Sequence, residues 1–176
     1  MQKIITIIGP ESTGKSDLAV YLSERLNAVL VEECARPYLE AIRRDYEYED
    51  VHQIAILQKE AYVNAVNTGS DIILMDTDLE VIKVWMEHKY NTCEEWILRH
   101  IAKQTPTLYL LTDIDMVWEE DPFREHPLPE QRQYFFNIYK DIVVQSGAPF
   151  FIVDGTGIER RQKIYSKIST FLARYT

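Results

Sequence analysis

One stretch of this sequence decides its fold: Gly9-Pro10-Glu11-Ser12-Thr13-Gly14-Lys15-Ser16. It fits the pattern Gly-x-x-x-x-Gly-Lys-Ser/Thr, which binds the phosphates of a nucleoside triphosphate when it joins a strand to a helix. Here the apolar run of residues 3–8 precedes the motif, and residues 15–27, which have helical periodicity, follow it. This context favours a phosphate-binding P-loop over the alternative, a tight glycine turn without a ligand.

The residue types in this loop each have a chemical reason. Glycine lets the backbone curl so that N–H groups point at phosphate oxygens, and the following helix adds the positive end of its dipole. Lys15 supplies a point charge to the β- and γ-phosphates, and the Ser16 hydroxyl is a ligand for Mg²⁺. We therefore predict that the protein uses ATP and Mg²⁺. The predicted ATP-binding residues of the loop and the helix start are Gly9, Glu11, Ser12, Thr13, Gly14, Lys15, Ser16 and Asp17.

Apolar runs alternate with segments of helical periodicity, the pattern of an α/β protein with a parallel sheet. Five short runs are predicted as strands, over residues 3–8, 28–32, 71–76, 107–112 and 149–153. Helices are predicted over 15–27, over 50–66, less regularly over 79–87, and after the fourth and fifth strands. A further helix, around residue 97, is expected to begin with a capping box of Thr92 and Glu95. We predict one domain, residues 1–176.

Acidic residues follow two of these strands, at the edge where open parallel sheets bind their ligands. Asp76 ends an apolar run and is predicted to hold Mg²⁺ together with Ser16, directly or through water. Alternatively, Asp76 caps the next helix, a role that Asp78 fills equally well. Glu33 is a candidate base for an acceptor hydroxyl, with Asp78 as its competitor and Arg36 as an anion clamp. The alternative for Glu33 and Arg36 is a solvated ion pair in a loop.

The segment 113–129 fits no regular element, and it carries six acidic residues, three prolines and a single arginine. Because loops of this length inside compact domains are usually functional, we predict a lid that closes over the triphosphate. Arg124 would then contact ATP and stabilise charge during transfer. The alternative is a solvated acidic loop in which Arg124 pairs with nearby acids. After the fifth strand, Gly155 and Arg160 are predicted to lie at the adenine, or else in an ordinary strand–helix turn.

Composition limits the classes of partner. The formal net charge of -9 disfavours nucleic acid, and Cys34 and Cys93 lie in no zinc-binding pattern. No apolar run approaches the ~20 residues of a membrane span, and the run before the P-loop is too short for a signal peptide. We therefore expect a cytoplasmic protein without nucleic-acid or membrane partners, and a homo-oligomer remains open.

Together, four motifs resemble the ribosylnicotinamide kinase domain of the bifunctional enzymes that also carry a nicotinamide-nucleotide adenylyltransferase domain. They are the P-loop in its form GPESTGKS, Glu33-Cys34-Ala35-Arg36, Asp76-Thr77-Asp78, and Trp118-Glu119-Glu120-Asp121-Pro122-Phe123-Arg124. The resemblance covers nearly the whole chain. It implies a nucleoside-kinase-like sheet with strand order 2-3-1-4-5.

The resemblance also implies a reaction, in which the γ-phosphoryl group of ATP passes to the 5′-hydroxyl of nicotinamide riboside. Glu33 or Asp78 would hold or deprotonate the ribose, and Arg124 would act from the lid. Trp85 or Trp118 would stack on the cationic pyridinium ring. The implied substrate-binding residues are Glu33, Arg36, Asp78, Trp85, Trp118 and Asp121. Cys34 stands where an aromatic residue is expected, which leaves the exact acceptor open.

Two other functions fit the same motifs. The first is a kinase for another nucleoside or metabolite. The second, of a different class, is an ATPase or switch module that regulates a partner and has no small acceptor. The base-specifying Asn-Lys-x-Asp motif of GTPases does not occur in the sequence.

Overall fold

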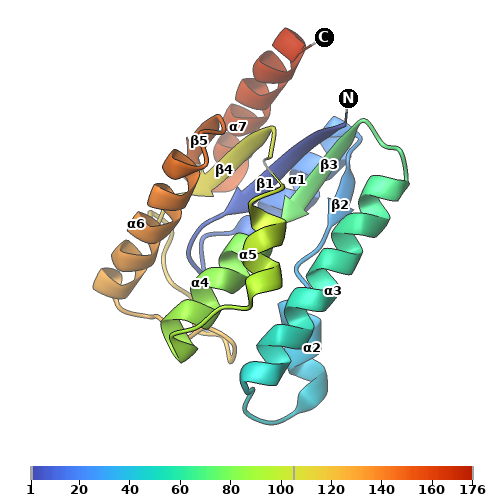
Figure 1. Cartoon of the computed structure of the whole chain (residues 1–176). Helices are drawn as coiled ribbons and strands as arrows, with labels where there is room; N and C mark the ends of the chain where they lie inside the picture. The colour runs from blue at the N-terminus through green and yellow to red at the C-terminus, as the bar shows by residue number, and fades with distance from the viewer. Residues whose placement is uncertain (1, 105, 176) are drawn as a thin grey trace.

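Strands and helices alternate along the chain. A computed structural model describes residues 2–104 and 106–175. Within these residues, five parallel strands form one sheet in the order β2-β3-β1-β4-β5 (Figure 1). The strands are β1 (Lys3–Ile8), β2 (Val29–Val31), β3 (Ile72–Asp76), β4 (Leu108–Thr112) and β5 (Phe150–Val153). The predicted P-loop fold and the strand order implied by the resemblance are both confirmed.

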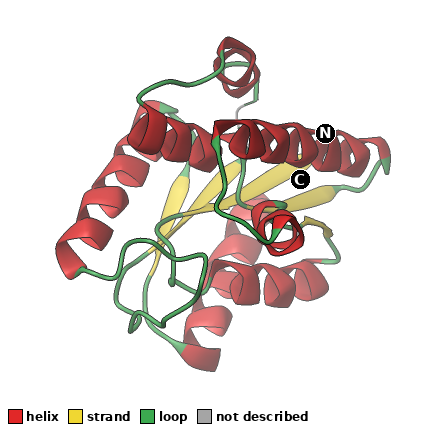
Figure 2. Cartoon of the chain, turned by 90° about the horizontal axis from the view of Figure 1, so that it is seen from below, coloured by secondary structure: helices red, strands yellow, loops and turns green. Residues whose placement is uncertain are grey.

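Helices cover both faces of the sheet (Figure 2). On one face, α1 (Lys15–Leu26) packs beside α7 (Gly157–Leu172), which ends in a 3-10 turn, Ala173–Tyr175. On the other face lie α3 (Tyr48–Asn67), α4 (Leu79–Tyr90) and α6 (Pro129–Gln145). Two shorter helices, α2 (Ala35–Ile42) and α5 (Glu95–Ile101), pack on α3 and α4 respectively.

Strand β1 lies at the centre of the sheet and is apolar on both sides. Its Ile5 is opposite Leu74 of β3 and Leu108 of β4. Ile7 packs toward α1 and α7, whereas the next residue, Ile8, packs toward α4 and α6. Since successive side chains of a strand point to opposite faces, a central strand covered by helices on both faces is mostly apolar, and here Thr6 is the one buried polar residue of β1. The continuous apolar run that precedes the P-loop has this origin.

All five strands run in the same direction, so the segments that follow them meet at one edge of the sheet. The P-loop follows β1, Glu33 follows β2, and Asp76 closes β3. A long loop, residues 113–128, follows β4, and the turn of residues 154–156 follows β5. The topology alone therefore brings these segments together.

The structure differs from the sequence prediction at several element boundaries. Residues after Glu33 form helix α2, which was not among the predicted helices, and Pro37 is tolerated because it lies in the first turn. The predicted capping box of Thr92 is wrong: Glu94 precedes α5, with no side-chain cap among the described residues. Strand β2 is shorter than predicted, and α4 runs on to Tyr90. Pro129 begins α6, so the irregular segment ends one residue earlier than predicted.

Candidate functional site

The backbone of the P-loop is held in a shape that few residues other than glycine permit. Gly9 has φ 148°, and a Cβ added to it would lie 2.2 Å from Thr112 Oγ1. Gly14, with φ 68°, precedes the first turn of α1. The Thr13 hydroxyl lies 2.8 Å from the Pro10 carbonyl and 2.7 Å from Thr112 Oγ1. Strand β4 thus supports the loop from behind, and Thr112 is a supporting residue that the motif did not reveal.

Two buried arginines contact carbonyl oxygens of the loop from outside. Arg160 of α7 donates to the Thr13 carbonyl at 2.8 Å. Arg132 of α6 donates to the Ser12 carbonyl at 3.3 Å and to the Met116 carbonyl at 2.9 Å. These cations add positive charge around an anion-binding loop. Arg160 was predicted for ATP, whereas Arg132 was missed because its helix position carries no local signal of what it packs against.

Lys15 and Ser16 begin α1 beside the carboxylate that ends β3. Lys15 Nζ donates to the Pro10 carbonyl at 2.8 Å, and burial lowers the pKa of Lys15 despite the neighbouring Glu33 and Asp76. Burial raises the pKa of Asp76, while hydrogen bonding from Ser16 and the charge of Lys15 oppose that rise. Among the described residues, the buried Asp76 Oδ1 has no hydrogen-bond partner. The Asp76 Oδ1 atom, which has no partner among the described residues, and the neighbouring Ser16 hydroxyl fit the ligand chemistry of Mg²⁺.

The two candidate bases, Glu33 and Asp78, lie in different environments. Glu33 is half-buried, and burial raises its pKa while the charge of Lys15 lowers it. Asp78 is almost fully buried and caps α4 by accepting from the Glu80 N–H at 2.9 Å. Burial raises the pKa of Asp78 to about 7. Between Asp76 and Asp78, Thr77 has φ 78°, a strained conformation for a β-branched residue.

A cavity of about 320 Å³ opens between the P-loop, α2, α4, α6 and the long loop. Lys15 lines it together with several aromatic side chains, among them Trp85, Phe123 and Tyr139. Of the predicted site residues, those that line it are Gly9, Glu11, Lys15, Glu33, Arg36 and Trp85. Sequence reasoning missed the other polar lining residues, which come from distant segments: Tyr46, Thr77, His88, Lys89, Glu125, His126 and Arg132.

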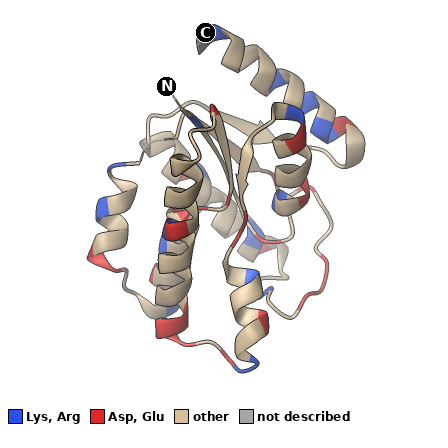
Figure 3. Cartoon of the chain, turned by 90° about the vertical axis from the view of Figure 1, so that its right-hand side faces the viewer, with Lys and Arg blue, Asp and Glu red and all other residues tan. Residues whose placement is uncertain are grey.

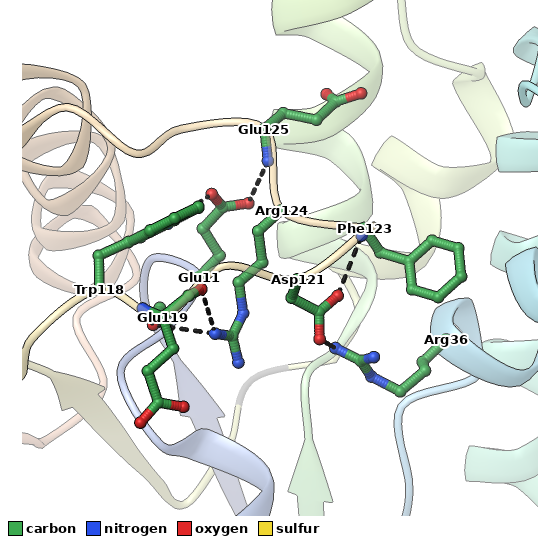
Figure 4. A network of polar contacts seen from close by, with 9 residues as sticks. Glu11, Arg36, Trp118, Glu119, Asp121, Phe123, Arg124 and Glu125 are labelled. Carbon is green, nitrogen blue, oxygen red and sulfur yellow. Dashed lines mark hydrogen bonds and ion pairs between the residues drawn. The ribbon is translucent and has the colours of Figure 1, made fainter.

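The long loop, residues 113–128, lies over the P-loop and is held there by side chains (Figure 4). Arg124 Nη1 donates to Ser12 Oγ at 3.2 Å and to the Glu119 carbonyl at 2.6 Å. Asp121 forms an ion pair with Arg36 of α2 at 3.0 Å. The structure therefore brings Arg124 to the P-loop and links Asp121 to Arg36. That this loop closes over a triphosphate stays a prediction.

Three further predicted site residues do not line the cavity and contact other parts of the chain. Asp17 is exposed and forms an ion pair with Arg161 of α7, with 2.6 Å between Arg161 Nη2 and Asp17 Oδ1. The Gly155 N–H donates to Asp115 Oδ2. The Trp118 indole donates to Glu11 Oε1 at 3.4 Å rather than lining the cavity.

Two observations bear on the expected partners. Lys and Arg are interspersed with Asp and Glu over the helices (Figure 3). In the described part of the chain, no helix has the length and apolar character that crossing a membrane requires.

Comparisons with known proteins agree with this geometry. The solved NadR protein in complex with NR is 25% identical with a TM-score of 0.78, and the match covers 95% of this chain and 50% of that one. NadR protein in complex with NAD and AMP-PNP is 26% identical with a TM-score of 0.74, over 94% of this chain and 48% of that one. This chain thus spans about half the length of these proteins.

A more distant likeness concerns the fold alone. Deoxyadenosine kinase from M. mycoides is 17% identical with a TM-score of 0.63, and the match covers 95% of this chain and 99% of the kinase. No curated protein matches the sequence. These likenesses agree with a P-loop fold of the nucleoside-kinase type. The AAA domain model matches residues 4–161, and the chain belongs to this family of P-loop proteins.

Proposed function

We propose that this chain is a small-molecule kinase that transfers the γ-phosphoryl group of ATP to the 5′-hydroxyl of a nucleoside, most specifically nicotinamide riboside. One observation carries the proposal: Lys15 of the P-loop and Glu33 line the same cavity, which continues between α2 and α4. A nucleotide-switch module has no need of such a cavity beside its phosphates. A kinase needs it for the acceptor.

The proposed reaction uses Glu33 as the base. The acceptor hydroxyl oxygen attacks the γ-phosphorus, the bond from that phosphorus to the β-phosphate oxygen breaks, and ADP leaves. The hydroxyl proton passes to the Glu33 carboxylate, and burial raises the pKa of Glu33, which makes this carboxylate a better proton acceptor. Lys15 and Arg124 stabilise the charge on the transferring group. Asp78 is the weaker candidate because its carboxylate caps α4 and lies outside the cavity lining.

Ser16 and Asp76 are proposed to hold Mg²⁺, since the Asp76 Oδ1 atom has no partner among the described residues. When bound, Mg²⁺ neutralises phosphate charge and orients the β- and γ-phosphates.

The aromatic lining of the cavity supports an acceptor with a flat ring. Of the two tryptophans proposed to stack on it, Trp85 lines the cavity, while Trp118 is engaged by Glu11. A pyridinium ring is cationic and is attracted by an aromatic face. The 25% identity to a NadR protein solved with NR makes nicotinamide riboside the first acceptor to test.

The deciding experiment is ADP formation from ATP and Mg²⁺ with a panel of nucleosides, nicotinamide riboside first. We expect ADP formation that depends on the presence of an acceptor. A preference for another nucleoside would keep the kinase and reject the substrate. ATP turnover that ignores every acceptor would reject the kinase and favour the ATPase or switch module.

A further inference from the structure

Glu11 is an unusual residue for a loop that binds polyphosphate, because a carboxylate there repels the ligand. Its oxygens face the long loop instead. Glu11 Oε1 accepts from the His126 N–H at 2.6 Å and from the Trp118 indole at 3.4 Å. Glu11 Oε2 accepts from the Glu125 N–H at 3.1 Å. The negative charge of Glu11 is therefore used to hold backbone that lies more than a hundred residues away in the sequence.

The residues that Glu11 holds form one wall of the cavity. Glu125 Oε1 accepts from the Tyr46 hydroxyl at 2.8 Å and from Lys89 Nζ at 3.0 Å. The His126 ring packs on Phe135 of α6 with 4.4 Å between ring centroids. Fixing the N–H groups of Glu125 and His126 fixes where these side chains meet α4 and α6. The shape of this wall consequently depends on a residue of the P-loop.

The opposite side of the same segment is tied to α2. Arg36 pairs with Asp121 at 3.0 Å and lies over the Phe123 ring at 5.5 Å, and Phe123 also lines the cavity (Figure 4). The segment 121–126 is thus held by the P-loop at one end and by α2 at the other. Because hydrogen bonds to an ionised group are stronger than neutral ones, the Glu11 contacts are a strong attachment for the backbone of residues 125 and 126.

We propose that Glu11 is a positioning residue for the acceptor: it latches segment 121–126 to the P-loop and so completes the wall of the acceptor cavity. This inference rests on the proposed function, which makes the cavity the acceptor site. Loss of the latch should weaken acceptor binding far more than nucleotide binding. A residue that contacted the phosphates would show the opposite pattern.

The test compares Glu11→Gln with Glu120→Gln, the same change at an exposed position of the same loop. Glutamine keeps the size of the side chain. Its amide nitrogen is a donor, however, so it cannot accept a hydrogen bond from one of the two backbone N–H groups that donate to Glu11. Losing hydrogen bonds to a charged acceptor corresponds to about tenfold or more in the opening equilibrium of the segment. Thermal unfolding of both variants verifies that the folded state is kept.

Two readouts decide the question. Amide hydrogen exchange at residues 125 and 126 should accelerate about tenfold in Glu11→Gln and stay unchanged in Glu120→Gln. The acceptor KM should rise about tenfold in Glu11→Gln, while the Kd for ATP changes less than about threefold. Unchanged exchange, an unchanged acceptor KM, or a Kd for ATP that rises as much as the acceptor KM would each overturn the latch. If the wild type uses no acceptor, the proposed function fails, and amide exchange alone then decides the latch.

Discussion

Replacing Glu33 by glutamine is the most direct test of the proposed chemistry. The change keeps the volume of the side chain in the cavity but removes the group that accepts the proton. A positioned general base contributes about 10²–10⁴-fold in rate, which corresponds to about 3–5 kcal/mol of activation free energy. We therefore expect kcat to fall within this range. The Kd for ATP should stay nearly the same, because the P-loop and its arginines are untouched.

The pH dependence of the rate gives a second signature of Glu33. Only the ionised carboxylate accepts a proton, and burial raises the pKa of Glu33 above its ordinary value. The wild-type kcat/KM should therefore rise with pH as Glu33 ionises. The variant should lack this rise while keeping its low residual rate.

The assay is a steady-state measurement of ADP formation with saturating ATP and varied acceptor, from pH 5 to 9. Asp78→Asn serves as the comparison, since asparagine caps a helix about as well as aspartate. It removes the competing carboxylate and keeps the bond to the Glu80 N–H. A wild-type rate for Glu33→Gln together with a large loss in Asp78→Asn would refute the assignment of Glu33.

Three further outcomes are expected. Lys15→Ala should abolish tight ATP binding in calorimetry, because it removes the charge next to the β- and γ-phosphates; retained affinity would contradict the P-loop interpretation. Gly9→Ala should destabilise the fold by about 2 kcal/mol or more in urea unfolding, since a Cβ would lie 2.2 Å from Thr112 Oγ1 at a φ of 148°. Asp78 binds its proton more tightly in the folded state, so its contribution lowers stability as pH rises from about 4 to about 7. Unfolding free energies of Asp78→Asn should fall less over that range, and an identical fall would contradict the raised pKa.

The sequence predicted the sheet well because its signals are local. Buried parallel strands must be apolar on both faces, so each of the five strands is visible as a short apolar run. The P-loop motif follows the first of these runs, which identifies that run as the strand before the phosphate-binding loop. Helix boundaries were less predictable. Thr92 has the right chemistry for a cap, but packing of Trp96 and Ile97 against α3 and α4 decides where α5 begins.

The candidate site was also predictable only where the signal is local. Glu33 and Asp76 could be predicted because they follow or end strands, and a parallel sheet places the ends of its strands at one edge whatever the side-chain packing. The remaining polar wall of the cavity comes from α4, α6 and the loops around Tyr46 and Glu125. These residues have no common spacing in the sequence, and only the folded chain brings them together.

The sequence by itself determined that this chain has a P-loop on a parallel sheet, with carboxylates at the carboxyl ends of the strands. The tertiary structure decided the role of each acidic side chain, because burial and hydrogen-bond partners set the pKa of a carboxylate and determine what it contacts. Asp78 and Glu33 are chemically alike in the sequence, yet one caps α4 and the other lines the cavity. Glu11 belongs to the phosphate motif, yet its carboxylate holds residues 125 and 126.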